Sequence, residues 1–504
     1  MSNVQRFRLG SSGVGHNLAQ YLAQKGYLVH ADCGGKGTCG KCRVQLVGGY
    51  LYENPECTRL AKPDKDGYVL ACRTWGCSGA IIQLPEQTGT GLTAFEGSAS
   101  AAKSEQSGLG IALDVGTTTL AAALVELATG KVLATTSALN PQASHGADVI
   151  SRIDAILHRP ETLAQMQGVL LERVRSMVDT LAGNTPISRT VVAGNPTMLH
   201  IFCGISPAGM GSYPFTPAFT HIKTLSGAQL GLPVETVTCL PSISAFVGGD
   251  ITAGMLHVGL TNSAQPALLL DIGTNGESVL FTGTEHGARL FAASAAAGPA
   301  LEGAGISSGM GGVDGAVSAV KLQSGTPVCT TVGNTPARGI CGSGLVDLVA
   351  ALYQADLLDD TGALECGEEF PYATTRKGDA LTVTQADIRA LQLCKSAIRA
   401  SLETLCVRAG IAPEQIAHVY LAGGLGYYIH VPSAVSIGLL PACFATCAQS
   451  VGNAALGGCV RALTDANAIH RMQTEAERTT TLELSTDPVW NEAFMEHMMF
   501  PEKE

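Results

Sequence analysis

The chain has 504 residues, of which 46% are hydrophobic and 14% charged, and its formal net charge is −11. This length allows two to four globular domains, whereas the lack of an 18-residue apolar run argues against a membrane span and the lack of long basic runs argues against nucleic-acid binding. Residues 1–6 carry no apolar segment typical of a secretory signal, and sixteen cysteines suit metal or redox chemistry in a reducing compartment, so we expect a cytoplasmic location.

Four cysteines and a run of glycines predict an iron–sulfur loop near the N-terminus. Cys33, Cys39 and Cys42 follow a C-x5-C-x2-C spacing, and Cys72 supplies a remote fourth thiol. Plant-type [2Fe–2S] proteins use C-x4-C-x2-C with a remote fourth cysteine, so the first gap here is one residue longer. The intervening glycines allow the backbone to wrap a cluster closely. Structural zinc, which usually shows two short cysteine knuckles instead of one, and unligated thiols remain the alternatives.

Residues 1–85 are predicted to form a small α+β ferredoxin-like domain. A short helix is expected over 17–23, with strands over 43–47, 69–72 and 80–84. Ten Lys and Arg against five Asp and Glu give these residues a formal charge of +5, so the rest, with 21 against 37, carries −16. The Gly, Ser, Thr and Ala content of residues 86–107 is typical of a flexible linker.

Two later segments share one pattern and predict a duplicated α/β architecture. An apolar strand ends at Asp114 in Asp-x-Gly-Thr, and another ends the same way at Asp271, 157 residues later. Each is followed by two further predicted strands and then by helices, so we divide the chain into a first half, 108–265, and a second half, 266–504. The strands are expected over 120–127, 132–137, 278–281 and 288–293, and the clearest helices over 148–157, 163–181 and 385–407.

The two Asp-x-Gly-Thr turns carry a definite chemistry. A tight turn of small residues exposes N–H groups and hydroxyls that can hold phosphate oxygens, and an aspartate at a strand end can hold Mg²⁺. Two such turns facing each other would hold a triphosphate from both sides. The predicted nucleotide residues here are Asp114, Gly116, Thr117, Thr118, Asp271, Gly273, Thr274, Asn275 and Gly276. Alternatively, the turns are only tight hairpins capped by their aspartates.

Two further segments complete the predicted nucleotide site. Gly423 and Gly424 follow a predicted strand, and glycines at this point let a flat base approach the backbone. Asp250 follows two glycines and is the candidate catalytic residue that orients a water molecule for hydrolysis.

Together, these segments resemble the superfamily of acetate and sugar kinases, heat-shock chaperones and actin. The resemblance implies an α/β chain in which the ferredoxin-like domain precedes a duplicated ribonuclease-H-like, actin-like ATPase fold. It also implies a first phosphate loop at 114–119, a second at 271–276, an adenosine motif at 422–426 and a hinge segment at 451–455.

The combination of a [2Fe–2S] domain with this ATPase fold resembles one family in particular, the RACo-type reductive activators of corrinoid-dependent enzymes. Further stretches read like that family, namely 195–200, 246–250, 297–303, 339–344, 397–400 and 499–501. The chain departs from some members, since 86–107 is too short for a folded linker domain. Cys443, Cys447 and Cys459 do not match a C-x2-C-x2-C motif, so no second cluster is expected.

The resemblance implies an ATP-dependent corrinoid reductase. Such a protein passes one electron from its [2Fe–2S] cluster to a Co(II) corrinoid protein and restores Co(I) in a methyltransferase system. It would use ATP with Mg²⁺ and an external low-potential reductant, with no nucleic-acid or membrane partner. The sequence leaves the oligomeric state open, a homodimer included.

Other functions remain open at this point. A small-molecule kinase with a redox sensor needs a catalytic carboxylate between the halves, for which Asp250 is the candidate. An activator of a 2-hydroxyacyl-CoA dehydratase resembles the ATPase halves, but such proteins hold a [4Fe–4S] cluster between subunits of a shorter chain. A non-enzymatic electron carrier whose ATPase halves only regulate docking is the third alternative.

Overall fold

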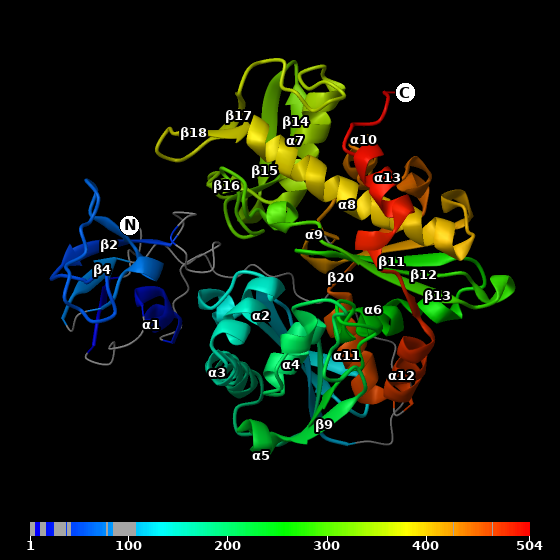
Figure 1. The fold of residues 1–504 in the computed structure, drawn as a ribbon, viewed down its shortest axis with the longest axis horizontal. Helices are drawn as coiled ribbons and strands as arrows, with labels where there is room; N and C mark the ends of the chain where they lie inside the picture. Colours follow the sequence, from blue (N-terminus) through cyan, green and yellow to red (C-terminus); the bar gives the residue numbers. More distant parts are fainter. Residues whose placement is uncertain are drawn as a thin grey trace.

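The computed structural model describes residues 6–10, 17–24, 37, 42–76, 79–83, 107–426, 428–465 and 467–503. Figure 1 shows a small N-terminal part beside two larger layered parts. Most of the predicted linker, and the cysteines Cys33 and Cys39, lie outside the described residues. Within the described residues, no helix is both long enough and apolar enough to cross a membrane.

The N-terminal part, here called the cluster domain, is a four-stranded sheet with one helix. Its strands pair in the order β1-β4-β2-β3, and helix α1 packs against the short turn η1. The elements are β1 (Arg6–Arg8), α1 (Leu18–Gln24), β2 (Arg43–Gly48), β3 (Tyr68–Leu70), η1 (Ala71–Arg73) and β4 (Ile81–Gln83). The predicted strand over 69–72 ends at Leu70, because the backbone turns there and the Ala71 amide donates to the Cys42 carbonyl at 2.8 Å. This turn brings Cys72 toward Cys42.

The first half is built on a six-stranded sheet with strand order β7-β6-β5-β8-β10-β9. Side chains of β5 alternate between its two faces, so that Ile111 and Leu113 pack under α3 whereas Ala112 packs under α11. The strands are β5 (Leu109–Val115), β6 (Thr119–Glu126), β7 (Lys131–Leu139), β8 (Ile187–Gly194), β9 (Lys223–Ser226) and β10 (Val234–Cys239). The helices are α2 (Val149–His158), α3 (Thr162–Ala182), α4 (Pro196–Phe202), α5 (Gly227–Leu230) and α6 (Gly249–Val258), with the turn η2 (Pro141–Ser144) before α2.

The second half repeats this sheet in the order β20-β19-β11-β12-β13-β21. Its strands are β11 (Ala267–Ile272), β12 (Gly276–Phe281), β13 (Leu290–Ala295), β19 (His418–Ala422), β20 (Ala448–Gly452) and β21 (Thr480–Thr481). The main helices are α7 (Gly342–Gln354), α8 (Gln385–Ala409), α9 (Gly423–Gly426), α10 (Val431–Ser436), α11 (Ala454–Thr464), α12 (Ala468–Arg478) and α13 (Pro488–Glu496). Two small sheets, one of β14 (Ala316–Gln323), β15 (Thr326–Thr331) and β16 (Gly339–Ile340), the other of β17 (Glu369–Thr374) and β18 (Ala380–Thr384), extend it.

The predicted duplication is confirmed by the topology. Each half begins with three consecutive antiparallel strands, β5–β6–β7 and β11–β12–β13. The next strand of each sheet, β8 or β19, then pairs in parallel with the first of the three. The longest predicted helix begins at Gln385, where Thr384 and Asp387 form the expected capping box. The fold therefore consists of two related α/β units that follow the cluster domain.

Two glycine-containing helices, α6 and α11, lie between the two large sheets (Figure 1). They approach so closely that a Cβ atom on Gly458 would lie 2.0 Å from the Ala253 carbonyl oxygen, and one on Gly457 would lie 2.3 Å from His257 Nδ1. Helix α11 follows strand β20 of the second sheet in sequence but contacts strands β5 and β8 of the first. The predicted hinge segment at 451–455 thus leads into a helix that joins both halves.

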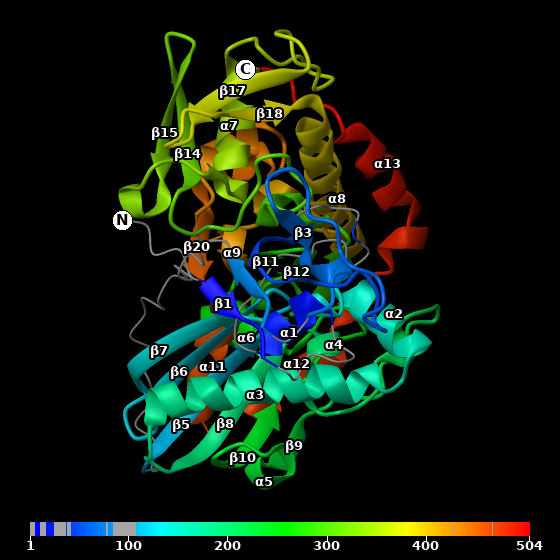
Figure 2. The same cartoon turned by 90° about the vertical axis from the view of Figure 1, so that its left-hand side faces the viewer.

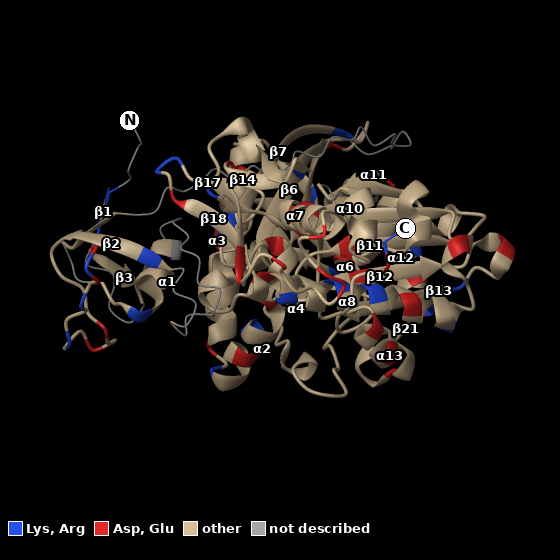
Figure 3. Ribbon diagram, turned by 90° about the horizontal axis from the view of Figure 1, so that it is seen from above, with Lys and Arg blue, Asp and Glu red and all other residues tan. Residues whose placement is uncertain are grey.

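The described part of the cluster domain contacts the first half at helix α1. Helix α1 lies against η2, the turn that follows β7. Figure 2, viewed from the side of the cluster domain, shows α1 in front of the first half. Figure 3 shows Lys and Arg segments on the cluster domain, in agreement with its positive formal charge.

Candidate functional site

The first predicted phosphate loop is a tight turn between β5 and β6. Asp114 stands near the end of β5, and the Gly116 amide donates to the Thr119 carbonyl at 3.0 Å. A Cβ atom at Gly116 would lie 2.5 Å from that same carbonyl oxygen. The turn therefore requires glycine at this position, and Thr117 and Thr118 follow at its tip.

The second predicted loop occupies the matching place in the second half, between β11 and β12, but its turn closes one residue earlier. Asp271 stands near the end of β11, and the Gly273 amide donates to the Asn275 carbonyl at 2.9 Å. A Cβ atom at Gly276 would lie 2.8 Å from Ile398 of α8, so this glycine lets the helix pack against the loop.

The predicted adenosine motif lies directly beside the second loop. Strand β19 pairs in parallel with β11, so that Ala422 is opposite Asp271 and Gly423 begins the next turn. Gly423 has φ of 84°, and a Cβ atom there would lie 2.4 Å from Asp271 Oδ1. A Cβ atom at Gly424 would meet no atom of the described residues within 4 Å, so this glycine borders open space there.

Acidic side chains from both halves gather between the loops. Burial raises the pKa of Asp114 to about 7 and that of Asp250 to about 6. Burial, together with the neighbouring carboxyls of Asp250 and Asp114, raises the pKa of Asp271 to about 8. The structure therefore brings the two loop aspartates and the candidate catalytic aspartate into one electrostatically coupled cluster. Asp250 lies in the first turn of α6, where its carboxylate accepts a hydrogen bond from the Ile251 amide at 2.9 Å.

Two glutamates that the sequence analysis missed belong to the same cluster. Burial raises the pKa of Glu277, on β12, and that of Glu302, beyond β13. The Glu302 carboxylate accepts hydrogen bonds from the hydroxyls of Thr118 and Thr274, at 3.3 and 2.9 Å. Glu277 comes three residues after the second Asp-x-Gly-Thr pattern and could have been suspected. Glu302 lies in the family-like stretch 297–303, but that resemblance assigned no role to the glutamate.

A buried arginine supports the first loop from behind. Arg152 on α2 is fully buried and donates to the Thr117 carbonyl at 2.7 Å, to Gly146 at 3.0 Å and to the Gln142 side chain at 3.0 Å. Burial lowers the pKa of Arg152 to about 9, so it stays charged at neutral pH. Because Gln142 belongs to η2, this arginine links the first loop to the turn on which the cluster domain rests.

Two asparagines hold the same loop from its other sides. Asn140 donates to the Gly116 carbonyl at 2.8 Å, and Asn195, the first residue of a family-like stretch, donates to the Thr117 hydroxyl at 2.9 Å. The backbone of the first loop is thus held by several side chains.

The residues present fit a nucleotide whose Mg²⁺ is shared between the protein and the phosphates. Within the described residues, no three Asp, Glu, His or Cys side chains lie close enough to hold a metal ion by themselves. The ion would therefore take one or two of these carboxylates, together with phosphate oxygens and water. Carboxylate oxygens are the ligands Mg²⁺ prefers, and the mutual repulsion of these acids is relieved by a divalent cation. The turns have the glycines that close backbone approach requires, on both sides of the same cluster.

The described part of the cluster domain fits an iron–sulfur centre. Cys42 and Cys72 are buried, and their sulfur atoms lie 3.2 Å apart without forming a disulfide. Two thiols this close, from distant parts of the chain, suit ligands of a shared metal centre. Cys33 and Cys39 lie outside the described residues, so their part in the centre stays a prediction.

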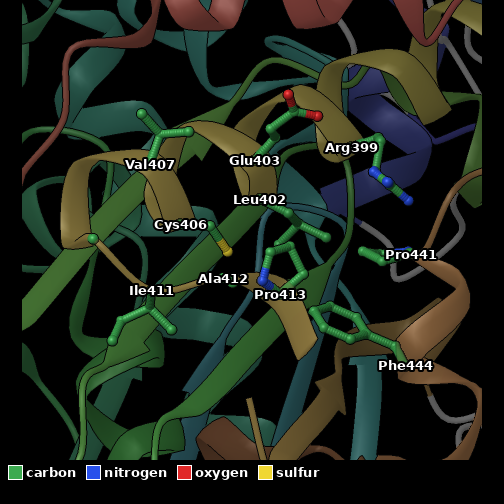
Figure 4. A pocket seen from close by; sticks show the side chains of 11 residues that line it. Arg399, Leu402, Glu403, Cys406, Val407, Ile411, Ala412, Pro413, Pro441 and Phe444 are labelled. Carbon is green, nitrogen blue, oxygen red and sulfur yellow. The ribbon is translucent and has the colours of Figure 1, made fainter. Parts of the chain in front are cut away.

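One cavity lined by described residues lies away from the predicted nucleotide residues. It has a volume of about 440 Å³ and lies at the C-terminal end of α8, where Arg399 and Cys406 face Pro413 and Phe444 (Figure 4). It adjoins the segment that precedes β19, whereas the adenosine motif follows the opposite end of that strand. None of the predicted nucleotide residues lines it.

Comparisons with known proteins bear on the whole chain. Family models match three consecutive regions, the 2Fe-2S iron-sulfur cluster binding domain over 11–75, the RACo middle region over 109–263, and the C-terminal domain of RACo, the ASKHA domain, over 265–504. The chain belongs to the RACo family. It is 34% identical to the "Corrinoid activation enzyme RamQ" of Eubacterium limosum, over 78% of this chain and 70% of that protein.

Two other RACo-related proteins extend the comparison. The Co(II) methylated amine-specific corrinoid protein reductase of Methanosarcina barkeri is 28% identical over 66% of each chain. A solved structure of a "Reductive activator for corrinoid,iron-sulfur protein" matches 98% of this chain and 97% of its own, with a TM-score of 0.72 and 29% identity. The likeness to this RACo-type structure therefore includes the cluster domain as well as both ATPase halves.

Proposed function

We propose that this protein is an ATP-dependent reductive activator that passes one electron to a Co(II) corrinoid protein and restores Co(I). The observation that carries the proposal is the match, over nearly the whole chain, to a solved reductive activator that contains the same sequence of parts. The two relatives named for corrinoid activation and corrinoid reduction point to the same substrate class. The partner is thus a corrinoid protein of a methyltransferase system.

The electron passes through the cluster domain. When bound, a [2Fe–2S] centre supplies a one-electron carrier, which we assign to Cys33, Cys39, Cys42 and Cys72. An external low-potential reductant returns the electron after each transfer, so that one electron enters for each Co(II) reduced. Burial of Cys42 and Cys72 keeps water from this side of the centre.

ATP bound between the two halves supplies the free energy for uphill electron transfer. A plant-type [2Fe–2S] centre lies near about −400 mV, and the Co(II)/Co(I) couple is expected to be lower. Each further 59 mV of uphill one-electron transfer costs about 1.4 kcal/mol, which closure of the cleft around ATP can offset. We assign Mg²⁺ binding to Asp114 and Asp271, phosphate binding to the two loops, and the adenosine to Gly423 and Gly424.

Asp250 is proposed to orient the water that attacks the γ-phosphate. Its carboxyl lies in the same acidic cluster as both loop aspartates, and its raised pKa, about 6, suits a group that accepts a proton near neutral pH. The bond between the γ-phosphorus and the bridging oxygen breaks, and ADP and phosphate leave.

We place this reaction in the cytoplasm, where the many free thiols of the chain stay reduced. A homodimer is a further proposed arrangement for this protein. Analytical sedimentation of the full chain tests it.

The test is an assay in which this protein reduces a purified Co(II) corrinoid protein, with and without Mg-ATP. The loss of the Co(II) absorbance measures the reduction. We expect Asp114→Asn and Asp271→Asn to abolish the ATP stimulation while the iron content and visible spectrum stay normal. We expect Cys42→Ser and Cys72→Ser to lose the cluster, whereas Cys57→Ser, which alters a partly exposed thiol, keeps it. ATP-stimulated reduction that survives in both aspartate variants would refute the assignment of Mg²⁺ binding to Asp114 and Asp271. Failure of the unaltered protein to reduce the corrinoid protein with Mg-ATP would refute the proposed function itself.

A further inference from the structure

Glu302 connects the two phosphate loops, one from each half of the ATPase fold. It ends the short turn η6 (Pro299–Glu302), which is flanked by Gly298 and Gly303, both with positive φ. One carboxylate oxygen of Glu302, Oε2, accepts hydrogen bonds from the hydroxyls of Thr118 and Thr274. The two threonines come from different halves, so this carboxylate bridges the halves at the tips of their loops.

The bridge uses donors that a phosphate group would need. A threonine hydroxyl has one proton and can donate it to one acceptor at a time. The Thr274 backbone amide also donates to Glu302, and a Cβ atom at Gly273 would lie 3.4 Å from Glu302 Oε1. The carboxylate therefore sits over the second loop in the manner expected of a phosphate oxygen.

We propose that Glu302 is an internal competitor of the nucleotide, whose carboxylate holds the two loops until a phosphate group displaces it. This inference rests on the proposed nucleotide site and adds a regulatory residue to it. Displacement exchanges a contact made by the protein for one made by the nucleotide, and the two loops then respond together to nucleotide binding. A carboxylate at this position also repels phosphate oxygens directly.

The fold keeps Glu302 ready for this exchange. Turn η6 packs against α7, α8 and α9, so the base of the glutamate is held firmly beside the adenosine motif. Its flanking glycines, which have positive φ, permit the sharp turn that points the side chain into the cleft.

The experiment measures the Kd of a non-hydrolysable Mg-ATP analogue, adenylyl imidodiphosphate, by calorimetry on the full chain. Removal of a charge-assisted hydrogen-bonding competitor in Glu302→Ala should lower this Kd about tenfold. Glu302→Gln should lower it less, because the amide oxygen can still accept from both threonines while the charge is gone.

Glu277→Gln is the matched control. Glu277 lies in the same acidic cluster, and its carboxylate pairs with the Ser294 hydroxyl on β13 and with the Asn275 side chain of the second loop. The bridging hydroxyls of Thr118 and Thr274 pair with Glu302 instead. Glu277→Gln keeps the size of the side chain and leaves the bridge in place, so the Kd should change by less than about twofold. Thermal melts of all variants check that they fold.

The outcomes separate this inference from the proposed function. If the unaltered protein binds no nucleotide analogue, the proposed function itself fails. If it binds but Glu302→Ala binds equally well or more weakly, the competitor role is overturned and the proposed function stands. If Glu277→Gln tightens binding as much as Glu302→Gln, general charge repulsion explains the effect and the bridge has no such role.

Discussion

Asn453 donates a hydrogen bond to the Asp114 carboxylate at 2.9 Å, although 339 positions separate the two residues in sequence. Asn453 also caps helix α11, because its side-chain oxygen accepts from the Leu456 amide at 2.8 Å. One amide side chain thus ties the helix that joins the two halves to the aspartate of the first phosphate loop. Movement of α11 relative to the first sheet would change this contact.

The first expected outcome concerns that hydrogen bond. In Asn453→Ser the helix cap is kept, since serine is also a good N-cap residue, but the shorter side chain no longer reaches Asp114. The bond holds down the pKa of Asp114, which is already about 7, so its loss leaves Asp114 less ionised at neutral pH. We expect the Kd for the Mg-ATP analogue at pH 7 to rise about three- to tenfold, an effect on the order of 1 kcal/mol.

Calorimetry at pH 6, 7 and 8 checks this outcome. The loss of affinity should shrink as the pH rises and Asp114 ionises in both proteins. An Asn453→Ser variant that binds like the unaltered protein at all three pH values would show that the contact has no influence on the site.

The second expected outcome is a pH-dependent stability that Mg²⁺ reverses. The pKa of Asp271 is about 8 in the folded protein and near 4 in an unfolded chain, so between these values the folded state holds the extra proton. The free energy of unfolding therefore falls as the pH rises through this window. Lys395 acts in the opposite direction, because burial lowers its pKa to about 7. The comparison is consequently made against Asp271→Asn, which lacks the titrating group and keeps the lysine.

Denaturant unfolding in EDTA from pH 6 to 8.5 measures the effect. Asp271→Asn should gain stability relative to the unaltered protein as the pH rises, by up to about 1.4 kcal/mol per pH unit. Mg²⁺ should stabilise the unaltered protein more at pH 8 than at pH 6, because it binds the ionised carboxylates. A stability difference between the two proteins that is constant with pH would contradict the raised pKa.

Much of this fold could be predicted from the sequence, because its clearest sequence patterns are local turns and helix caps. The two Asp-x-Gly-Thr turns predicted paired hairpins, and the structure has them between β5 and β6 and between β11 and β12. The capping box at Thr384 marked the start of α8 correctly. The ends of strands were harder to predict. The strand expected over 69–72 ends at Leu70, because a tertiary contact with Cys42 decides where the backbone turns.

The residues of the candidate site could be predicted from the sequence only where they belong to a short motif. Asp114 and Asp271 are recognisable from their turns, but Arg152 is one basic residue on a helix whose burial depends on η2 and α4. Glu302 lies 28 residues beyond Thr274, and its contact with Thr118 spans the cleft between halves. Arg152 has no pattern that distinguishes it from a solvated charge, and the family-like stretch 297–303 does not by itself show what Glu302 contacts. The three-dimensional arrangement reveals both contacts.

The third expected outcome concerns the buried arginine. Arg152→Met fills a similar volume but leaves the carbonyls of Thr117 and Gly146 without their donor. Loss of buried charge-assisted hydrogen bonds should lower the free energy of unfolding by about 2–4 kcal/mol and weaken nucleotide binding, since the first loop loses its support.

Urea unfolding and calorimetry test the role of Arg152 together. Arg159→Met is the matched control, because Arg159 is exposed just after the same helix and should change stability by less than about 0.5 kcal/mol. Equal unfolding midpoints for the two variants would show that the buried guanidinium does not support the loop.

The last expected outcome concerns how the cluster domain meets its partner. Arg73 follows the ligand Cys72 and is exposed, and a Cβ atom at Gly37 would lie 2.8 Å from its side chain, so Arg73 crosses the predicted cluster loop. Arg43, beside Cys42, is instead paired with Asp64 and stacked on Tyr68 within its own domain. Arg73 is therefore the described arginine best placed to attract an acidic partner surface at the cluster.

Stopped-flow reduction of the corrinoid protein at increasing salt tests this steering. We expect the second-order rate constant to fall as salt rises, because charges more than about 10 Å apart are screened at 0.1 M. Arg73→Glu should lower the rate constant about three- to tenfold at low salt, and the difference should vanish at high salt. Arg59→Glu makes the same charge change at an arginine already paired with Glu53 and should have a smaller effect. A rate that rises with salt would instead show that release of α1 from η2 limits the reaction, because salt would then free the positive domain from the acidic halves on which it rests.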